Sequence, residues 1–433
     1  MASKADTARR DAAGRTLASR ACTHGLPGLI GIAPVLTMLL SWAGPGAEIS
    51  GWQAIVKAFA LPVVAVELAI IATAMARSGK WAPSALPRRY LAAAAALLLL
   101  ALTTAFAAAS PATAVVRTGL WIVHCAFAWS IYLLCTRSWL DPTKVVSALL
   151  AGFGISCLLL ILFISQIEDP ARFKWVNGLP GFDNIRRGAY FAAPIAGLCL
   201  GRFSSAPGRS RAFSATIYML AIAFIFWSGA RGAVFAIAAA FAIGAAILPQ
   251  LRSMKGTIIM LAASATGICL AWVYSFKTGF SGFRRMFMGA DGEAFQPNSD
   301  LTSGRADLWI STWQTILQRP LFGHGEGQTG YVVPLGQEMD IFHPHNLVLQ
   351  VLLAWGVMGA LLLLYLALPI ARAALENARA RKECVPPFAA MLVILLYSAI
   401  DGTLFHVHAV ALFAACVGMI ALSDPANSAR PVR

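Results

Sequence analysis

The sequence predicts an all-α polytopic membrane protein, and its composition and apolar runs carry that prediction. Apolar residues make up 58% of the 433 residues and charged residues only 12%, with a mean hydropathy of +0.70. A water-soluble domain of this size keeps far more charge on its surface. Runs of about 20 apolar residues recur, and each can cross a hydrocarbon core about 30 Å thick as a helix. We therefore expect a single integral membrane domain over residues 1–433.

The apolar runs predict twelve membrane spans. We place them at residues 26–43, 55–76, 90–109, 115–135, 145–165, 189–200, 212–227, 232–248, 258–276, 346–368, 388–400 and 405–422. Between the ninth and tenth spans, residues 277–343 form the one polar stretch that approaches the length of a small domain. We expect this stretch to fold over the membrane as one large loop.

The net charge of +15 does not indicate nucleic acid binding, because of where the charges lie. If the N-terminus is inside, 22 of the 34 lysines and arginines fall in segments on the inner side. Membrane proteins show this excess in their cytoplasmic loops. Both termini are therefore expected in the cytoplasm, and residues 277–343 on the outer face.

A short amphipathic helix is predicted inside the large loop, lying on the outer leaflet. Four apolar residues follow the spacing of one helical face: Trp309, Trp313, Ile316 and Leu317. Ser303 is a suitable N-cap and Pro320 ends the helix. The glycines that follow do not indicate a nucleotide site, since no strand precedes them and no lysine follows.

Arginines gather at the predicted outer boundary. Arg186 and Arg187 open the sixth span, and Arg305 precedes the amphipathic helix. Arg231 lies in the tight turn SGARG between the seventh and eighth spans. Any one of them could extend to lipid headgroups. Together their guanidinium groups could bind a diphosphate through paired hydrogen bonds that lysine does not reproduce.

Histidines and one aspartate complete the candidate chemistry. His343, His345 and Asn346 lie at the outer start of the tenth span, where His345 is expected in the first helical turn. A helix N-terminus keeps a nearby imidazole neutral and able to accept a proton. Asp401 lies at the outer end of the eleventh span, where an ionisable group is a functional candidate, with helix capping as the alternative.

Two other histidine arrangements point to structure more than to chemistry. The second His-x-His pair, at residues 406 and 408, could join the first in a zinc site. We do not expect one, because no cysteine or carboxylate accompanies either pair in the sequence and residues two apart on a helix face different ways. His124, in the middle of a span, is expected to be a hydrogen-bonded core residue.

The motifs between residues 303 and 359 resemble those of a known family. SGRADLW and PLFGHGEG are followed by HNLVLQVLLAWGVMG, in which His-Asn precedes nine residues and then Gly-x-x-Gly. The SGARG turn matches the same family. On these residues the chain resembles the bacterial O-antigen ligases and the wider O-antigen ligase/polymerase superfamily. The resemblance implies a GT-C-like fold of about twelve helices, with one large periplasmic loop between helices nine and ten.

The resemblance also implies an activity. Such ligases transfer a glycan from undecaprenyl diphosphate to a terminal sugar of lipid A–core, on the periplasmic face of the bacterial inner membrane, completing lipopolysaccharide. They are viewed as inverting glycosyltransferases that need no metal and no cofactor. Carried over by motif, His345 would be the base on the acceptor hydroxyl. Arg231 and Arg305 would hold the diphosphate, with Arg187 a weaker transfer.

The remaining candidates and alternatives follow from the same reading. His343, Asn346 and Asp401 are expected to contact substrate. The alternative enzyme is an O-antigen polymerase, which shares the lipid-linked donor and takes another lipid-linked glycan as acceptor. A membrane transporter or flippase would show charges deep within spans and an internal repeat of spans, and neither is clear here.

Overall fold

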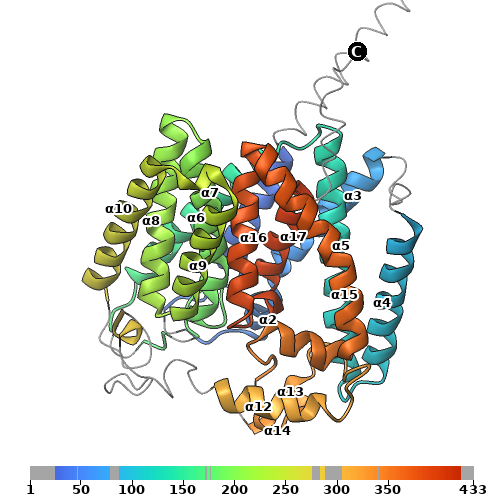
Figure 1. The fold of residues 1–433 in the computed structure, drawn as a ribbon. Helices are drawn as coiled ribbons and strands as arrows, with labels where there is room; N and C mark the ends of the chain where they lie inside the picture. Colours follow the sequence, from blue (N-terminus) through green and yellow to red (C-terminus); the bar gives the residue numbers. More distant parts are fainter. Residues whose placement is uncertain are drawn as a thin grey trace, which may run out of the picture.

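The computed structural model describes residues 25–45, 47–78, 87–170, 173–175, 177–275, 283–287, 305–338 and 341–420. Every regular element in these ranges is a helix (Figure 1). Seven of them are long and apolar enough to cross a membrane: α3 Leu61–Ser78, α4 Arg88–Phe106, α5 Pro111–Thr136, α6 Pro142–Ile164, α8 Gly208–Ser228, α10 Met254–Val273 and α15 Leu347–Ala380. The chain is therefore a polytopic α-helical membrane protein.

Five shorter helices complete the main bundle. They are Gly25–Leu40, α7 Ala189–Ser205, α9 Arg231–Ile247, α16 Val385–Ser398 and α17 Val407–Ile420. Each of the twelve predicted spans overlaps a helix, although the number that cross the membrane stays a prediction. The short helices α7 and α16 correspond to the sixth and eleventh predicted spans.

The centre of the bundle is formed by α7 and α16, which pack against each other. Gly197 and Gly201 of α7 lie directly against the backbone of Ala390 and Pro386 of α16, so no larger side chain fits there. Around this pair, α8 and α10 pack together, α17 and α3 pack on α5, and α15 packs on α4 (Figure 1).

A buried hydrogen bond between two ionisable side chains lies within the spans, away from the loops. His124 of α5 and Glu67 of α3 approach to 2.8 Å between Nδ1 and Oε1, and both side chains are buried. A charge in a hydrocarbon layer is tolerated when it is paired in the protein interior. His124 is thus a hydrogen-bonded core residue.

The predicted span at residues 55–76 is not one helix. A short helix, α2 Gly51–Phe59, starts at a capping box formed by Ser50 and Gln53. It ends at Ala60, whose φ of 44° is left-handed, and α3 begins at once. Ala60 therefore separates the short helix α2 from the membrane-spanning helix α3. The apolar sequence does not predict this break, because the left-handed conformation of Ala60 depends on tertiary contacts.

Besides the 3-10 helix η3 Phe283–Met286, the described parts of the large loop form three short α-helices at one end of the bundle (Figure 1). These are α12 Arg305–Ile316, α13 Thr329–Val332 and α14 Pro334–Glu338. The apolar stripe predicted for α12 is split. Ile316 is buried, while Trp313 and Leu317 are 48% and 58% exposed and could meet the outer leaflet. Ser303, the predicted N-cap, lies outside the described residues.

Gly356 interrupts α15, where the sequence predicts one unbroken helix whose two glycines admit a neighbouring helix. Its φ of 61° and ψ of −166° belong to a region that only glycine adopts readily. The partner that approaches Gly356 is the backbone of Leu321 and Phe322, a loop and not a helix. The prediction that Gly356 admits a neighbouring helix is therefore wrong.

The loop that follows α12 satisfies the hydrogen bonds that the break opens. The backbone amides of His324 and Gly325 donate to the carbonyl oxygens of Leu353 and Ala354, at 2.7 and 2.9 Å. In return the amides of residues 357 and 358 donate to the carbonyl oxygens of residues 320 and 321, at 2.9 and 3.1 Å. A break inside a membrane protein is tolerated only where its polar groups are paired in this way.

We expect Gly356→Ala to destabilise the protein. The added Cβ would collide with the Leu321 backbone, and the backbone conformation alone costs about 1–3 kcal/mol for a residue other than glycine. The measurement is the melting temperature of the purified protein in detergent. Gly119→Ala is the matched control, because a Cβ there meets nothing within 4 Å. Equal melting temperatures for the two variants would contradict the docked break.

Candidate active site

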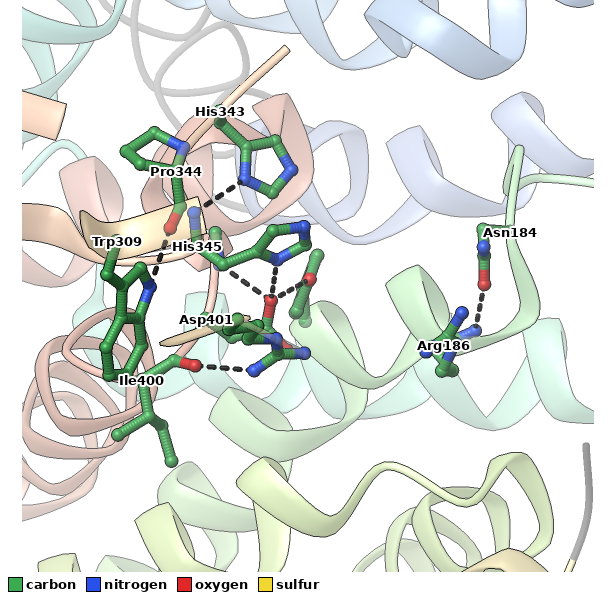
Figure 2. A network of polar contacts seen from close by, with 11 residues as sticks. Asn184, Arg186, Trp309, His343, Pro344, His345, Ile400 and Asp401 are labelled. Atoms are coloured by element: carbon green, nitrogen blue, oxygen red, sulfur yellow. Dashed lines mark hydrogen bonds and ion pairs between the residues drawn. The ribbon is translucent and has the colours of Figure 1, made fainter. Parts of the chain in front are cut away.

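Asp401 is the centre of a polar network just beyond the end of α16 (Figure 2). Its Oδ1 accepts hydrogen bonds from the Tyr190 hydroxyl at 2.6 Å and the Gly402 amide at 2.8 Å. The same oxygen lies 2.6 Å from Nδ1 of His345. Its Oδ2 forms an ion pair with the Arg305 guanidinium at 2.9 Å. The carboxylate thus joins α7, α12, the start of α15 and the end of α16.

Arg305 makes a second contact that fixes its place. Another nitrogen of its guanidinium donates to the Ile400 carbonyl oxygen at 2.6 Å. Arg305 is the first residue of α12, so these two bonds attach that helix to the end of α16. The side chain remains 22% exposed, which leaves part of the fork accessible.

His345 holds an unusual backbone conformation immediately before α15. Asn346 is the N-cap and the helix begins at Leu347, so His345 precedes the first turn that we expected it to occupy. Its φ of 53° is left-handed, which is uncommon for a residue other than glycine. Such strain persists when the surroundings over-determine it, and it gathers at functional sites. Here it accompanies the contact of the imidazole with Asp401.

The neighbours of His345 are held by their own hydrogen bonds. The Asn346 side chain accepts from the Leu349 amide at 3.1 Å and donates to the Ala399 carbonyl oxygen at 3.0 Å. The indole nitrogen of Trp309 donates to the Pro344 carbonyl oxygen at 2.9 Å (Figure 2). The oxygen of the Asn346 amide therefore caps α15, while its nitrogen fixes the strained turn to the end of α16. Trp309 fixes the same turn to α12.

The network shifts the titration of its members. Burial alone would raise the pKa of Asp401, but the hydrogen bond from His345 and the charge of Arg305 lower it far below its usual range. Burial lowers the pKa of His345, and the Asp401 carboxylate offsets only part of that effect. At neutral pH the pair is therefore an aspartate beside a neutral imidazole.

A cluster of rings lies behind His345. The His343 ring centroid is 4.1 Å from that of His345 and 5.3 Å from that of His406. His406 in turn stacks on Tyr190 at 4.9 Å. Burial lowers the pKa of both His343 and His406, and neighbouring cations add to the effect. Gly402 makes room for this packing, because a Cβ there would collide with the His343 ring.

The proximity of these histidines raises the question of a metal site. In the described part of the chain, no group of three or more His, Cys, Asp or Glu side chains is arranged to hold a metal ion. His408, the last member of the second pair, packs against Phe182 and Phe191 and belongs to the aromatic core.

Four arginines interact electrostatically in the neighbourhood of Asp401. Arg305 is joined by Arg186 of the 3-10 helix η1 Ile185–Gly188, by Arg231 at the start of α9, and by Arg285. Burial and the charges of the other three lower the pKa of Arg285 to about 9. We name Arg186, Arg231, Arg285 and Arg305 the arginine cluster. Several guanidinium groups in one region can together bind an anion with several oxygens.

Sequence reasoning missed Arg285 and grouped Arg187 with its neighbour. Arg285 lies in the 3-10 helix η3 Phe283–Met286, and a signal was present, since positive charge is disfavoured on the predicted outer face. Arg187 pairs with Asp183 and acts electrostatically on His343 and His406. It therefore lies on the histidine side of Asp401, apart from the arginine cluster.

The structure brings His345 and Arg305 into direct contact with Asp401, with His343 and Arg187 nearby. Arg231 is connected to this group through its electrostatic interaction with Arg285. Arg231 and Arg305 lie in the arginine cluster, whereas Arg187 and His343 lie with the histidines. Tyr190, which no motif indicated, separates the two by donating to Asp401 and stacking on His406.

The fold and this site define a polytopic membrane protein with a buried His–Asp–Arg network beside clustered cations. The family model described as O-antigen ligase matches residues 216–364, from α8 into α15, and it includes Arg231, Arg285, Arg305 and His345. The match supports the O-antigen ligase family, to which the motifs also pointed. A search of the curated proteins gives no match. Tyr190 and Asp401 complete the site from outside the matched segment.

We expect Asp401→Asn to lower the free energy of unfolding by about 1.5–3 kcal/mol, the usual contribution of hydrogen bonds to a charged group. The folded-state pKa of Asp401 is depressed, so its contribution is complete above the ordinary pKa of 3.8 and is lost only as the pH falls further. The loss should therefore be constant between pH 6 and 8 when unfolding in detergent is measured.

Glu376→Gln is the control for the change in net charge, because Glu376 is exposed on α15. If Asp401→Asn melts like Glu376→Gln, the network does not hold these helices together.

Proposed function

We propose that this protein is an O-antigen ligase that transfers a glycan from undecaprenyl diphosphate to a terminal sugar of lipid A–core. The match to the O-antigen ligase family model supports transfer of lipid-linked glycans by a membrane enzyme of the ligase/polymerase type. The observation that carries the proposal is the bridging of His345 and Arg305 by one carboxylate. It sets a neutral base beside a cation that can hold a leaving diphosphate.

The proposed reaction uses His345 as the base. Because Nδ1 faces the Asp401 carboxylate, it carries the proton, and Nε2 is left to accept one. Nε2 takes the proton of the acceptor hydroxyl as its oxygen attacks the anomeric carbon of the donor sugar. The new bond forms as the bond to the diphosphate oxygen breaks, on opposite faces of that carbon, so the configuration inverts. Asp401 stabilises the resulting imidazolium.

The arginine cluster would stabilise the departing diphosphate. Negative charge develops on its oxygens as the glycosidic bond breaks, and donors already in place are worth most where water is excluded. Arg231, Arg285 and Arg305 supply planar forks that can bind two oxygens each. We propose that they act without a metal ion, since guanidinium groups provide the opposing charge.

We further propose that the site faces the periplasm of the bacterial inner membrane. The support is the excess of lysine and arginine in the segments predicted to be cytoplasmic. The helices α12 to α14 and the start of α15 lie together at one end of the bundle, the end that this bias assigns to the outside (Figure 1).

The defining experiment is transfer by the purified protein. Undecaprenyl-diphosphate glycan is supplied with lipid A–core in one reaction, and with a second lipid-linked glycan as acceptor in another. Glycosylated lipid A–core is the expected product. Elongation of the lipid-linked glycan alone would identify a polymerase, and the absence of both products would reject the glycosyltransferase.

We expect His345→Ala to lower the rate of transfer by about 10²–10⁴, the usual contribution of a general base. In the wild type, kcat/KM should stay constant as the pH falls to about 6.5, because burial lowers the pKa of His345, and should then decrease as the base is protonated. His408→Ala serves as a control, since its ring packs in the aromatic core.

The same profile tests the role of Asp401 as a positioning residue. Its carboxylate raises the pKa of His345, so Asp401→Asn should both slow transfer and move the acidic limb to lower pH. A slower variant with an unmoved limb would mean that Asp401 acts on the fold and not on the base.

We expect Arg305→Lys and Arg231→Lys to be nearly as slow as the alanine variants, because a point charge does not replace the planar fork. Full activity of the two lysine variants would indicate that these arginines only reach to lipid headgroups.

We expect EDTA to leave the rate of transfer unchanged. Loss of transfer on chelation, restored by Mg²⁺, Mn²⁺ or Zn²⁺, would overturn the arginine mechanism.

A further inference from the structure

Arg117 is a charged residue inside a membrane-spanning helix, and neither the arginine cluster nor the network of Asp401 includes it. It lies in the second turn of α5 and is half-buried. An ionisable group within a span is costly to keep there, so its presence marks a functional region. The contacts of Arg117 lead to the rings behind His345.

Two contacts attach Arg117 to Phe405. Its Nη1 donates to the Phe405 carbonyl oxygen at 3.1 Å. The centre of its guanidinium group lies 3.8 Å from the centroid of the Phe405 ring, and 5.7 Å from that of Phe59 in α2. A guanidinium group over the face of an aromatic ring is attracted by the ring electrons. Arg117 therefore holds both the backbone and the side chain of Phe405.

Phe405 supports the histidine that packs on the proposed base. Its ring centroid lies 4.7 Å from that of His343. The His343 ring centroid lies 4.1 Å from that of His345, and Nδ1 of His343 accepts a hydrogen bond from the His345 amide at 3.4 Å (Figure 2). His343 therefore contacts both the ring and the left-handed backbone of His345. A shift of the Phe405 ring would remove the support from this contact.

The loop after α12 holds Arg117 from the other side. Gly327 packs on its side chain, since a Cβ there would lie 3.1 Å from Cγ of Arg117. Glu326 is buried, accepts a hydrogen bond from the Gln350 amide group at 3.0 Å and interacts electrostatically with Arg117. Burial raises the pKa of Glu326, and the Gln350 bond and the charge of Arg117 offset part of that rise. The last two residues of PLFGHGEG thus help to fix the cation.

We propose that Arg117 is a positioning residue for the base, and that it acts on His345 through Phe405 and His343 without contacting a substrate. This inference rests on the proposed role of His345 in transfer. A base must lie within hydrogen-bond reach of the hydroxyl that it deprotonates, and a displacement of about 1 Å can slow a reaction about 10²-fold. Side chains packed in series transmit a shift, because a close-packed interior has little space to absorb it.

The test is the kinetics of Arg117→Met, which keeps a side chain to pack on Gly327 and removes both contacts with Phe405. The kcat of transfer should fall about ten- to hundred-fold, because the base is displaced. The KM values of lipid A–core and of the lipid-linked donor should stay unchanged, since neither substrate loses a contact.

Arg137→Met is the matched control. Arg137 follows the other end of α5 and makes the same two kinds of contact. It donates to the Ser78 carbonyl oxygen at 3.0 Å, and its guanidinium centre lies 5.3 Å from the centroid of the Trp139 ring. Its substitution should leave kcat unchanged.

Two further variants separate positioning from folding. Arg117→Lys should retain most of the wild-type kcat, because an ammonium group can also donate to a carbonyl and lie over a ring. Phe405→Leu should lower kcat as Arg117→Met does, and the double variant should be no slower than either, since both changes break the same link. Melting temperatures in detergent show which variants are folded.

Three results would overturn the proposal. Equal kcat values for Arg117→Met and Arg137→Met would leave Arg117 as a contact between helices only. A raised KM for donor or acceptor would make it a substrate contact. Multiplied losses in the double variant would separate its action from Phe405. In each case the wild type still transfers glycan to lipid A–core, so the proposed function survives. If the wild type transfers nothing, the proposed function fails first and the positioning role fails with it.

Discussion

The carboxylate of Asp401 is the group on which the arrangement of the site depends. Burying a carboxylate is costly unless hydrogen bonds and an opposite charge compensate it. Here the compensation comes from Tyr190 on α7, Arg305 on α12, His345 before α15 and the amide of Gly402. Because each donor belongs to a different segment, satisfying one charge also fixes the base and a candidate diphosphate ligand relative to each other.

A second constraint holds the loop against the membrane domain. The break at Gly356 frees backbone groups in α15, and residues 320–325 pair with them. The loop therefore has a rigid support at Gly356, about three helix turns beyond the cap at Asn346. Two motifs that indicated the family therefore take part in the same contact between the loop and α15. They are PLFGHGEG and Gly356, which follows His-Asn after nine residues. Because α15 supports this loop, the site residues on it can keep their geometry during a reaction.

Charge divides the site into two sides. The arginine cluster shares the electrostatic field at Arg285, whereas Arg187 acts on the histidines at 343 and 406. His345 between them experiences cations from both directions, which together with burial keep its imidazole neutral. The Asp401 carboxylate restores part of its basicity. These opposing effects on the pKa of His345 allow it to accept a proton although cations surround it. Without the carboxylate, a histidine in these surroundings would be a poorer base.

The amino-acid sequence determined the membrane class, the helices and most of the chemistry-bearing residues, because apolar runs and residue types are local properties. It indicated His345, Arg231, Arg305 and Asp401 for that reason. Only the tertiary structure decided which of them meet. Tyr190 forms a hydrogen bond with an aspartate 211 residues away in the sequence. Lys57 belongs to an apolar run in the sequence, but in the structure it is a buried residue in the last turn of α2, because the helix ends before Ala60. The side chains of Arg186 and Arg187 are neighbours in the sequence but have different surroundings in the structure. Packing, and not sequence spacing, decides which groups each side chain meets.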